Sequence, residues 1–226
     1  MAQWNPALTP DEALNMLMQG NANFAANRTV RARIGMCERR KKELLSGQNP
    51  LAIILCCSDS RIAPQYVFDR EIGELFVIRV AGNVVDSVVI GSIEYAIEQF
   101  STPLVMVLGH QNCGAVQAAA THALHGYPDA TGSEHISAII DKIMPSVERA
   151  RERGENSARL CDEAAIENAL SSAVELRQRS DIVKQRVAKG ELKVVSGIFN
   201  LLTLKVELVP GAPEPSHQSK PVCTGE

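Results

Sequence analysis

The sequence has no long apolar run, no excess of one charge and no leader-like N-terminus. No apolar run approaches the roughly 20 residues that a membrane-spanning helix needs. The 226 residues carry a formal net charge of -3, which gives no electrostatic case for binding nucleic acid or an anionic membrane. The first residues, MAQWNPALTPDEAL, lack a basic segment followed by an apolar one. We therefore expect a cytoplasmic protein with neither nucleic acid nor membrane as a partner.

The sequence also lacks internal repeats and any clear domain boundary. With 45% hydrophobic residues it has ordinary globular composition and enough length for one domain with a substantial core. The last residues, 210–226, are rich in Pro, Ser and Gly and show no apolar periodicity. We expect a single domain over 1–209 and a disordered tail over 210–226.

Six cysteines are present, and their even number is compatible with disulfides. A chain of this size needs no covalent staples, and a cytoplasmic compartment is reducing. Packing, redox chemistry and metal binding therefore remain the alternatives for these cysteines.

The apolar pattern predicts an α/β fold. Three continuous apolar runs, 51–57, 74–82 and 103–109, are typical of strands covered on both faces. Helical spacing separates or precedes them at 9–27, 36–46 and 90–100, which implies right-handed crossovers and a mostly parallel central sheet with helices on both faces. The first of these helices would form an N-terminal arm.

Further helices are expected after the third strand. The pattern indicates helices over 114–126, 134–153 and 162–189, followed by a C-terminal strand or hairpin within 191–209. The alternating charges of 162–189 suggest a solvated outer face.

Potential metal ligands follow two of the predicted strands. LCCSDSR (55–61) contains Cys57 at the end of the first strand, and GHQNCGA (109–115) offers His110 and Cys113 at the end of the third. Ligands of open parallel sheets bind outside the carboxyl ends of the strands, so these three side chains can meet there. Two thiolates and an imidazole suit zinc, and three protein ligands leave the fourth position open for catalysis.

Neither group is specific by itself. A buried cysteine is often only a small apolar residue, and an Asp–Arg pair at a strand end is often only structural. Positions 57, 59 and 61 point the same way in an extended segment, so Asp59 would lie beside the metal with Arg61 holding it ionised. Cys56 points the other way, which favours core packing for that residue.

These residues resemble the β-class carbonic anhydrases. CSDSR (57–61) is similar to the family's Cys-x-Asp-x-Arg motif, and HQNCGA (110–115) to its His-x-x-Cys-Gly motif. The likeness continues through GELFVIRVAGN (73–83) and SIEYAIEQF (92–100) and covers roughly residues 9–209.

The resemblance implies one Zn²⁺ per subunit, held by Cys57, His110 and Cys113, with Asp59 and Arg61 as the catalytic dyad. It implies reversible hydration of CO2 to bicarbonate and a proton by attack of zinc-bound hydroxide. It also implies a homodimer or homotetramer. The residues that it places in the substrate pocket are Gln48, Phe76, Ala81, Tyr95 and Gly114. Tyr95 would reach in from a partner subunit, and a side chain in place of Gly114 would crowd the site.

Two positions depart from one form of the family pattern. Ile54 stands where some members have a Trp, and Phe199 stands where they have a Tyr. Those two residues support an inhibitory bicarbonate site that moves the Asp from the Arg to zinc, so we expect Asp59 to stay on Arg61.

Two alternative functions remain open. Hydrolysis of carbonyl sulfide or carbon disulfide would use the same zinc site with a differently shaped apolar cleft. A non-catalytic zinc or redox-sensing protein would instead use the Cys56–Cys57 pair and would predict four protein ligands or a reversible disulfide.

Overall fold

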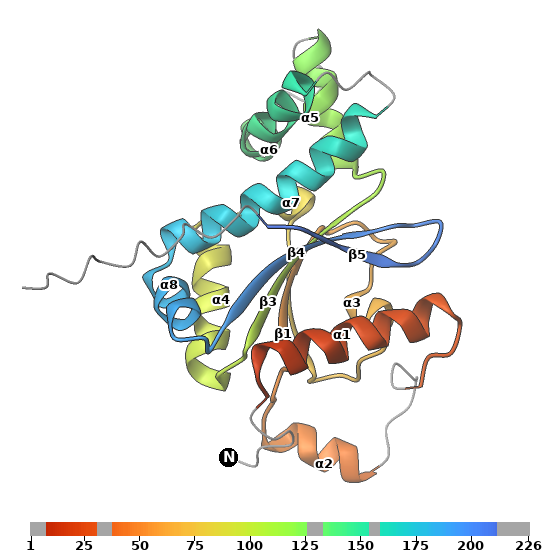
Figure 1. Cartoon of the computed structure of the whole chain (residues 1–226), viewed down its shortest axis with the longest axis vertical. Helices are drawn as coiled ribbons and strands as arrows, with labels where there is room; N and C mark the ends of the chain where they lie inside the picture. Colours follow the sequence, from red (N-terminus) through yellow and green to blue (C-terminus); the bar gives the residue numbers. More distant parts are fainter. Residues whose placement is uncertain (1–7, 31–37, 126–132, 154–158, 212–226) are drawn as a thin grey trace, which may run out of the picture.

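A five-stranded sheet forms the centre of the molecule in this computed structural model, which describes residues 8–30, 38–125, 133–153 and 159–211 (Figure 1). The strand order is β2-β1-β3-β4-β5. The first four strands run parallel, and β5 is antiparallel to β4. The strands are β1 (Ala52–Cys56), β2 (Leu75–Arg79), β3 (Leu104–His110), β4 (Lys193–Phe199) and β5 (Val206–Val209). The expected α/β fold with a mostly parallel sheet and a C-terminal hairpin is confirmed.

The helices follow the predicted order along the chain. They are α1 (Pro10–Ala25), α2 (Glu38–Ser46), α3 (Pro64–Val67), the 3-10 turn η1 (Ala81–Asn83), α4 (Ser87–Phe100), α5 (Gly114–His125), α6 (Glu134–Glu152), α7 (Leu160–Arg179) and α8 (Asp181–Ala188). Among the described helices, none combines the length and the apolarity that a membrane span requires. Most of the tail, residues 212–226, lies outside the described part of the chain.

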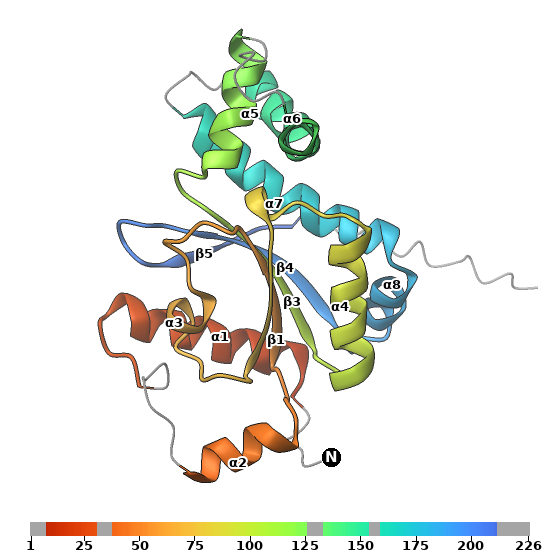
Figure 2. The same cartoon turned by 180° about the vertical axis from the view of Figure 1, so that it is seen from behind.

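Helices cover both faces of the sheet, as Figures 1 and 2 show. Residues of α4, α7 and α8 pack on one face with Leu55 and Val107. Residues of α1 and α3 pack on the other face with Ile54 and Met106. Every residue of β1 and β3 is buried, which explains why both strands read as continuous apolar runs.

A third cluster lies beyond the carboxyl ends of the strands, where α5 and α6 pack against each other and against α7 (Figure 1). It contains Cys57 and Cys113 together with Val116, Ile143 and Ala164. These helices therefore close off the end of the sheet at which the metal ligands were expected.

Two boundaries differ from the sequence-based expectation. The helix expected over 162–189 is two helices, because Ser180 ends α7 in an extended conformation and caps α8 by accepting from the Val183 N–H. The strand expected over 74–82 ends at Arg79, because Gly82 adopts a φ of 69° inside the η1 turn.

Candidate metal centre

Cys57, His110 and Cys113 meet at the carboxyl ends of two neighbouring strands. Cys57 follows β1, His110 ends β3 and Cys113 precedes α5, and β1 pairs directly with β3. The ligand atoms of the three residues all lie within 4.8 Å of one another. All three residues are buried, and His110 has no exposed surface. The arrangement fits a metal ion, since three soft or borderline donors converge where water has little access.

The two adjacent cysteines have different environments because strand residues alternate between the faces of a sheet. Cys56 belongs to the apolar cluster under α1, whereas Cys57 belongs to the cluster with Cys113. Burial raises the pKa of the Cys56 thiol to about 12. Cys56 is therefore a neutral packing residue at physiological pH, as the alternation predicted.

The imidazole of His110 is oriented for coordination through Nε2. Its Nδ1 lies 2.8 Å from the carbonyl oxygen of Gln111, which can only accept, so Nδ1 carries the proton. Nε2 is therefore unprotonated in the neutral ring, and it is buried without a hydrogen bond to any described residue. A buried acceptor without a partner is costly unless something occupies it, and a cation satisfies this one.

Hydrogen bonds to the Cys57 sulfur favour its thiolate. The Cys113 thiol donates to it across 4.0 Å, and the backbone N–H of Gly82 donates across 3.3 Å. The Cys113 thiol is the largest cause of the lowered pKa of Cys57, which burial opposes and which the Gly82 N–H reinforces. The pKa of Cys113 is raised because it supplies that proton and is buried. The two sulfurs thus lie close enough to share a proton, which a divalent cation would displace.

Asp59 and Arg61 form a two-pronged ion pair beside the cluster. The Arg61 Nε and Nη2 atoms donate to the two carboxylate oxygens of Asp59 at 2.9 and 2.6 Å. These side-chain bonds, helped by the Arg61 backbone N–H, hold the pKa of Asp59 well below its usual range. Asp59 Oδ2 lies 4.0 Å from His110 Nε2. An ionised acceptor thus faces the ligand atoms, in the arrangement that the spacing 57, 59, 61 predicted.

Hydrogen bonds from two arginine side chains to backbone carbonyls hold the dyad and its turn in place. Arg61 Nη2 also donates to the Asn112 carbonyl, in the loop that links His110 to Cys113. Arg79, at the end of β2, donates to the carbonyls of Cys57 and Asp59 at 3.2 and 2.7 Å. We did not anticipate these roles of Arg79 and Asn112. Both residues lie inside the stretches that carry the family resemblance, 110–115 and 73–83, but no sequence pattern signals these hydrogen bonds, and the positive φ of Asn112 is visible only in the structure.

Two of the five expected pocket residues, Phe76 and Tyr95, lie on the α4 side of the sheet. Phe76 of β2 packs on Tyr95 of α4 with ring centroids 6.4 Å apart, and Tyr95 is 54% exposed. Ala81 precedes Gly82, whose N–H contacts Cys57. Gln48 is exposed and precedes β1, so it lies at the opposite end of that strand from Cys57. The structure therefore does not bring Gln48 to the cluster of its own chain.

The reason given for Gly114 needs correction. We expected a side chain there to crowd the site, but a Cβ built on Gly114 has nothing within 4 Å among the described residues. Gly114 starts α5 with its side-chain direction toward open space, since the ligand Cys113 turns inward one residue earlier. Within a single chain, the space at this position is free.

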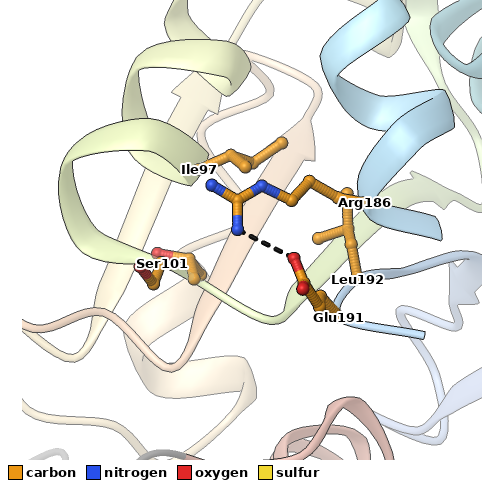
Figure 3. Close-up of a pocket in the computed structure, with 6 residues that line it drawn as sticks. Ile97, Ser101, Arg186, Glu191 and Leu192 are labelled. Carbon is orange, nitrogen blue, oxygen red and sulfur yellow. Dashed lines mark hydrogen bonds and ion pairs between the residues drawn. The ribbon is translucent and has the colours of Figure 1, made fainter. Parts of the chain in front are cut away.

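Two hollows lie outside the ligand cluster. One, of about 540 Å³, borders Arg61 on the side of the sheet covered by α1 and is otherwise lined mainly by Phe24, Phe199 and leucines of the β4–β5 loop. The other, of about 200 Å³, lies at the opposite end of the sheet between α4 and α8, where Arg186 donates to Glu191 (Figure 3). No residue of the expected site lines the second hollow.

The sequence matches a family model and known proteins over most of its length. The family model described as "Carbonic anhydrase" matches residues 52–206. A carbonic anhydrase of Mycolicibacterium smegmatis is 34% identical over 203 residues, covering 90% of this chain and 95% of the relative. Carbonic anhydrase 2 of Mycobacterium tuberculosis is 36% identical over 197 residues, covering 87% and 91%.

Solved structures share the fold. A Coccomyxa β-carbonic anhydrase in complex with acetazolamide superposes with a TM-score of 0.67 and 23% identity, covering 87% of this chain and 86% of that one. A structure described among two tetrameric β-carbonic anhydrases from Sordaria macrospora gives a TM-score of 0.68 and 17% identity, covering 87% and 96%. At these identities the likeness concerns the fold alone.

Proposed function

The chain belongs to the β-carbonic anhydrase family, and we propose that it catalyses the reversible hydration of CO2 to bicarbonate and a proton. The observation that carries this proposal is the buried Cys57–His110–Cys113 cluster with the ionised Asp59 carboxylate 4.0 Å from His110 Nε2. A purely structural metal site would have no need for an acceptor held in that place.

Zinc is the metal that the donor set favours, with one ion per subunit. Two thiolates and one imidazole nitrogen are typical ligands of tetrahedral zinc, and three protein ligands are typical of a catalytic site. The orphaned Nε2 of His110 and the proton shared by the two thiols both fit a divalent cation at this point. When bound, zinc acts as a Lewis acid that lowers the pKa of water, to about 7 in the three-histidine carbonic anhydrases.

Asp59 is proposed to orient the nucleophile by accepting a hydrogen bond from its hydroxyl group. Because Arg61 occupies both carboxylate oxygens, Asp59 stays ionised and can only accept hydrogen bonds. A hydroxyl that donates to Asp59 Oδ2 directs a lone pair away from the carboxylate, toward an electrophile. Arg61 is itself held by the Asn112 carbonyl, so the direction of the acceptor is fixed before substrate arrives.

CO2 is proposed to bind against Phe76, Ala81, Tyr95 and the backbone at Gly114. CO2 has no net dipole, so an apolar wall excludes water from the reacting carbon without competing for hydrogen bonds. Gln48 would donate to a substrate oxygen, and because it lies at the far end of its own β1, it would do so in a partner subunit.

A second copy of the chain is the proposed partner, in a homodimer or a homotetramer. β2 is an edge strand, and exposed apolar side chains lie near it, including Ile72 at 61%, Val88 at 77% and Tyr95 at 54% exposure. Association would cover this surface and place the Gln48 of one subunit near the cluster of the other. The Sordaria macrospora relatives are described as tetrameric, which supports an assembly.

The cytoplasm is the proposed compartment. The four described cysteines, Cys56, Cys57, Cys113 and Cys161, are all free, which suits a reducing environment. The redox-sensing alternative predicted a disulfide or four protein ligands, and the described residues provide neither. No observation favours hydrolysis of carbonyl sulfide or carbon disulfide over CO2 hydration.

Zinc content and stopped-flow CO2 hydration, measured on wild type and Asp59→Ala, test the proposal. We expect about one zinc per chain in both proteins and a loss of about 100-fold or more in turnover for Asp59→Ala. An Asp59→Ala variant with full zinc and full turnover would remove Asp59 from the mechanism. A zinc-loaded wild type without CO2 hydration would refute the proposed reaction itself.

A further inference from the structure

The η1 turn provides a backbone donor to one of the two sulfur ligands. Gly82 donates its N–H to the Cys57 sulfur at 3.3 Å, in a buried position. Its φ of 69° is one that residues with a side chain rarely adopt. A Cβ at this residue would also lie 2.6 Å from Ile143 Cδ1 and 3.2 Å from Ala115 Cβ. Close packing and backbone conformation thus both require glycine here.

Glycine is also the residue with the greatest backbone freedom, so something else must hold this N–H on the sulfur. The Asn168 side chain supplies that restraint: its Nδ2 donates to the Gly82 carbonyl at 2.7 Å. Asn168 is 2% exposed and lies in the middle of α7, far from Gly82 along the chain. Asn168 thus ties the Gly82 carbonyl to α7, and the Gly82 N–H stays directed at the Cys57 sulfur.

The helix that carries Asn168 is itself anchored to the strand that carries His110. A Cβ on Gly109 would lie 3.3 Å from both the Ala165 carbonyl and the Ala169 Cβ, so α7 and β3 approach as closely as a glycine allows. On the other side of Asn168, the buried Glu167 pairs with Arg149 and Arg153. Asn168 therefore acts from a support whose position relative to the ligand His110 is fixed.

We infer that Asn168 is a positioning residue of the metal centre, which holds the Gly82 N–H on the Cys57 sulfur. An N–H directed at a thiolate withdraws charge from it, so the sulfur donates less to a bound metal and leaves that metal a stronger Lewis acid. This inference rests on the proposed function for its consequence in catalysis. The hydrogen-bond chain from α7 to the sulfur is a feature of the protein alone.

Asn168→Leu removes the donor while keeping the branched shape of the side chain, and Ser196→Ala is the matched control. Ser196 also makes a buried hydrogen bond to α7, donating to the Ala169 carbonyl at 3.1 Å, but it does not contact the η1 turn. A general loosening of α7 would affect both variants, whereas loss of the restraint on Gly82 affects only Asn168→Leu. If Asn168→Leu fails to fold, Asn168→Ala removes the same donor without any risk of overpacking.

The variants are purified without metal, reconstituted with Co²⁺ or Zn²⁺ and compared with wild type. In Asn168→Leu we expect the sulfur-to-cobalt charge-transfer band to move to longer wavelength, because an unrestrained Gly82 leaves the sulfur more electron-rich. We also expect zinc affinity, measured by chelator competition, to fall about tenfold, because the loss of an ordered turn around Cys57 outweighs the stronger donation of its sulfur. Ser196→Ala should keep the wild-type band and affinity.

A band and an affinity that stay at the wild-type values in both Asn168 variants would overturn the inference. So would equal changes in Asn168→Leu and Ser196→Ala, since these would indicate only a loosened helix. A wild type that binds cobalt but does not hydrate CO2 would contradict the proposed function alone, and the band would still decide the role of Asn168. A wild type that binds neither metal would refute both.

Discussion

At the residue scale, the chemistry depends on the alternation of side chains after β1. Cys56 faces the apolar cluster under α1, Cys57 faces His110 and Cys113, and Asp59 and Arg61 continue on the same side as Cys57. Adjacent cysteines therefore differ in pKa and in role, although they are identical in chemistry.

This difference predicts opposite outcomes for two alanine substitutions. Cys57→Ala removes a proposed metal ligand. Its zinc affinity should therefore fall by far more than the roughly 10- to 100-fold that follows loss of a residue hydrogen-bonded to a ligand. Cys56→Ala should keep about one zinc per chain and lose about 1 kcal/mol of stability, because a buried sulfur is removed from the core. Metal analysis after dialysis against a chelator, together with urea unfolding, distinguishes the two. Loss of zinc from Cys56→Ala would contradict the alternation.

The ion pair with Arg61 determines how the protonation of Asp59 responds to low pH. The pKa of Asp59 is held low in the folded protein. Its ionised form therefore stabilises the fold at pH values above the usual pKa of aspartate, and this stabilisation is lost only as the pH falls through the lowered pKa. In Arg61→Ala the pKa of Asp59 should rise, and the acidic limb of kcat/KM should move to higher pH, with turnover reduced about 10- to 100-fold.

The matched control for that pH profile is Arg186→Ala. Arg186 also pairs with carboxylates, those of Glu98 and Glu191, but at the end of the sheet away from the ligands. Its removal should leave the acidic limb where wild type has it. If the two arginine variants shift the limb equally, the effect is one of overall charge and not of the Asp59–Arg61 pair.

The sequence indicated the ligands and the dyad because each of them lies within a short spacing, which strand geometry alone converts into a shared direction. It did not indicate Asn168, which is remote from Gly82 along the chain, or Arg79, which acts from the neighbouring strand. Contacts between distant segments leave no periodicity to detect. The sequence therefore indicates the candidate metal ligands but not the residues that orient them.

At the scale of elements, the close approach of α7 to the sheet fixes the site. Gly109 lies in β3 directly before His110, and a Cβ there would lie 2.8 Å from Ile198 Cδ1 in addition to its contacts with α7. The glycine is thus required by packing between two elements and not by its backbone conformation.

Gly109→Ala should destabilise the protein by about 1–3 kcal/mol through overpacking. Because the residue is next to His110, zinc affinity should fall as well. Ile198→Val deletes the methyl group that the new Cβ would meet, so the double variant should recover part of the lost stability. Urea unfolding of the three variants measures this coupling. Additive effects of the two substitutions would show that Ile198 is not the neighbour that matters.

The type of each helix or strand was predictable where the apolar spacing was regular. The residues at which the elements end were not predictable. The break between α7 and α8 at Ser180 is invisible in a charged, amphipathic pattern that continues through it. Ser180 is fully buried and donates to Glu94 of α4 while it caps α8. The helix ends there because a tertiary contact satisfies the cap, and no local signal encodes that contact.

At the scale of the whole molecule, the proposed assembly rests on the position of Gln48 and on the exposed apolar side chains near β2. Val88→Asp would place a charge in the surface that a second copy is proposed to cover. We expect it to sediment as a monomer and, deprived of the partner's Gln48, to lose about 100-fold in CO2 hydration. Analytical ultracentrifugation and stopped-flow assays on the same samples measure both quantities.

Leu124→Asp is the control for that prediction. Leu124 is 47% exposed on α5, away from the edge strand, so a charge there should change neither the assembly nor the turnover. An active Val88→Asp monomer would contradict the proposal that a partner completes the site, and unchanged sedimentation would contradict the proposed surface.

The sequence by itself determined the α/β class, the parallel sheet, the three candidate metal ligands and the Asp59–Arg61 pair. Each of these follows from local periodicity, from the alternation of strand residues and from motifs of a few residues. Only the tertiary structure decided that Gly114 has free space beside it, that Gln48 is remote from its own ligand cluster, and that Asn168 reaches the turn beside Cys57. These features depend on how closely separate elements approach, and that distance is set by the packing of the whole core.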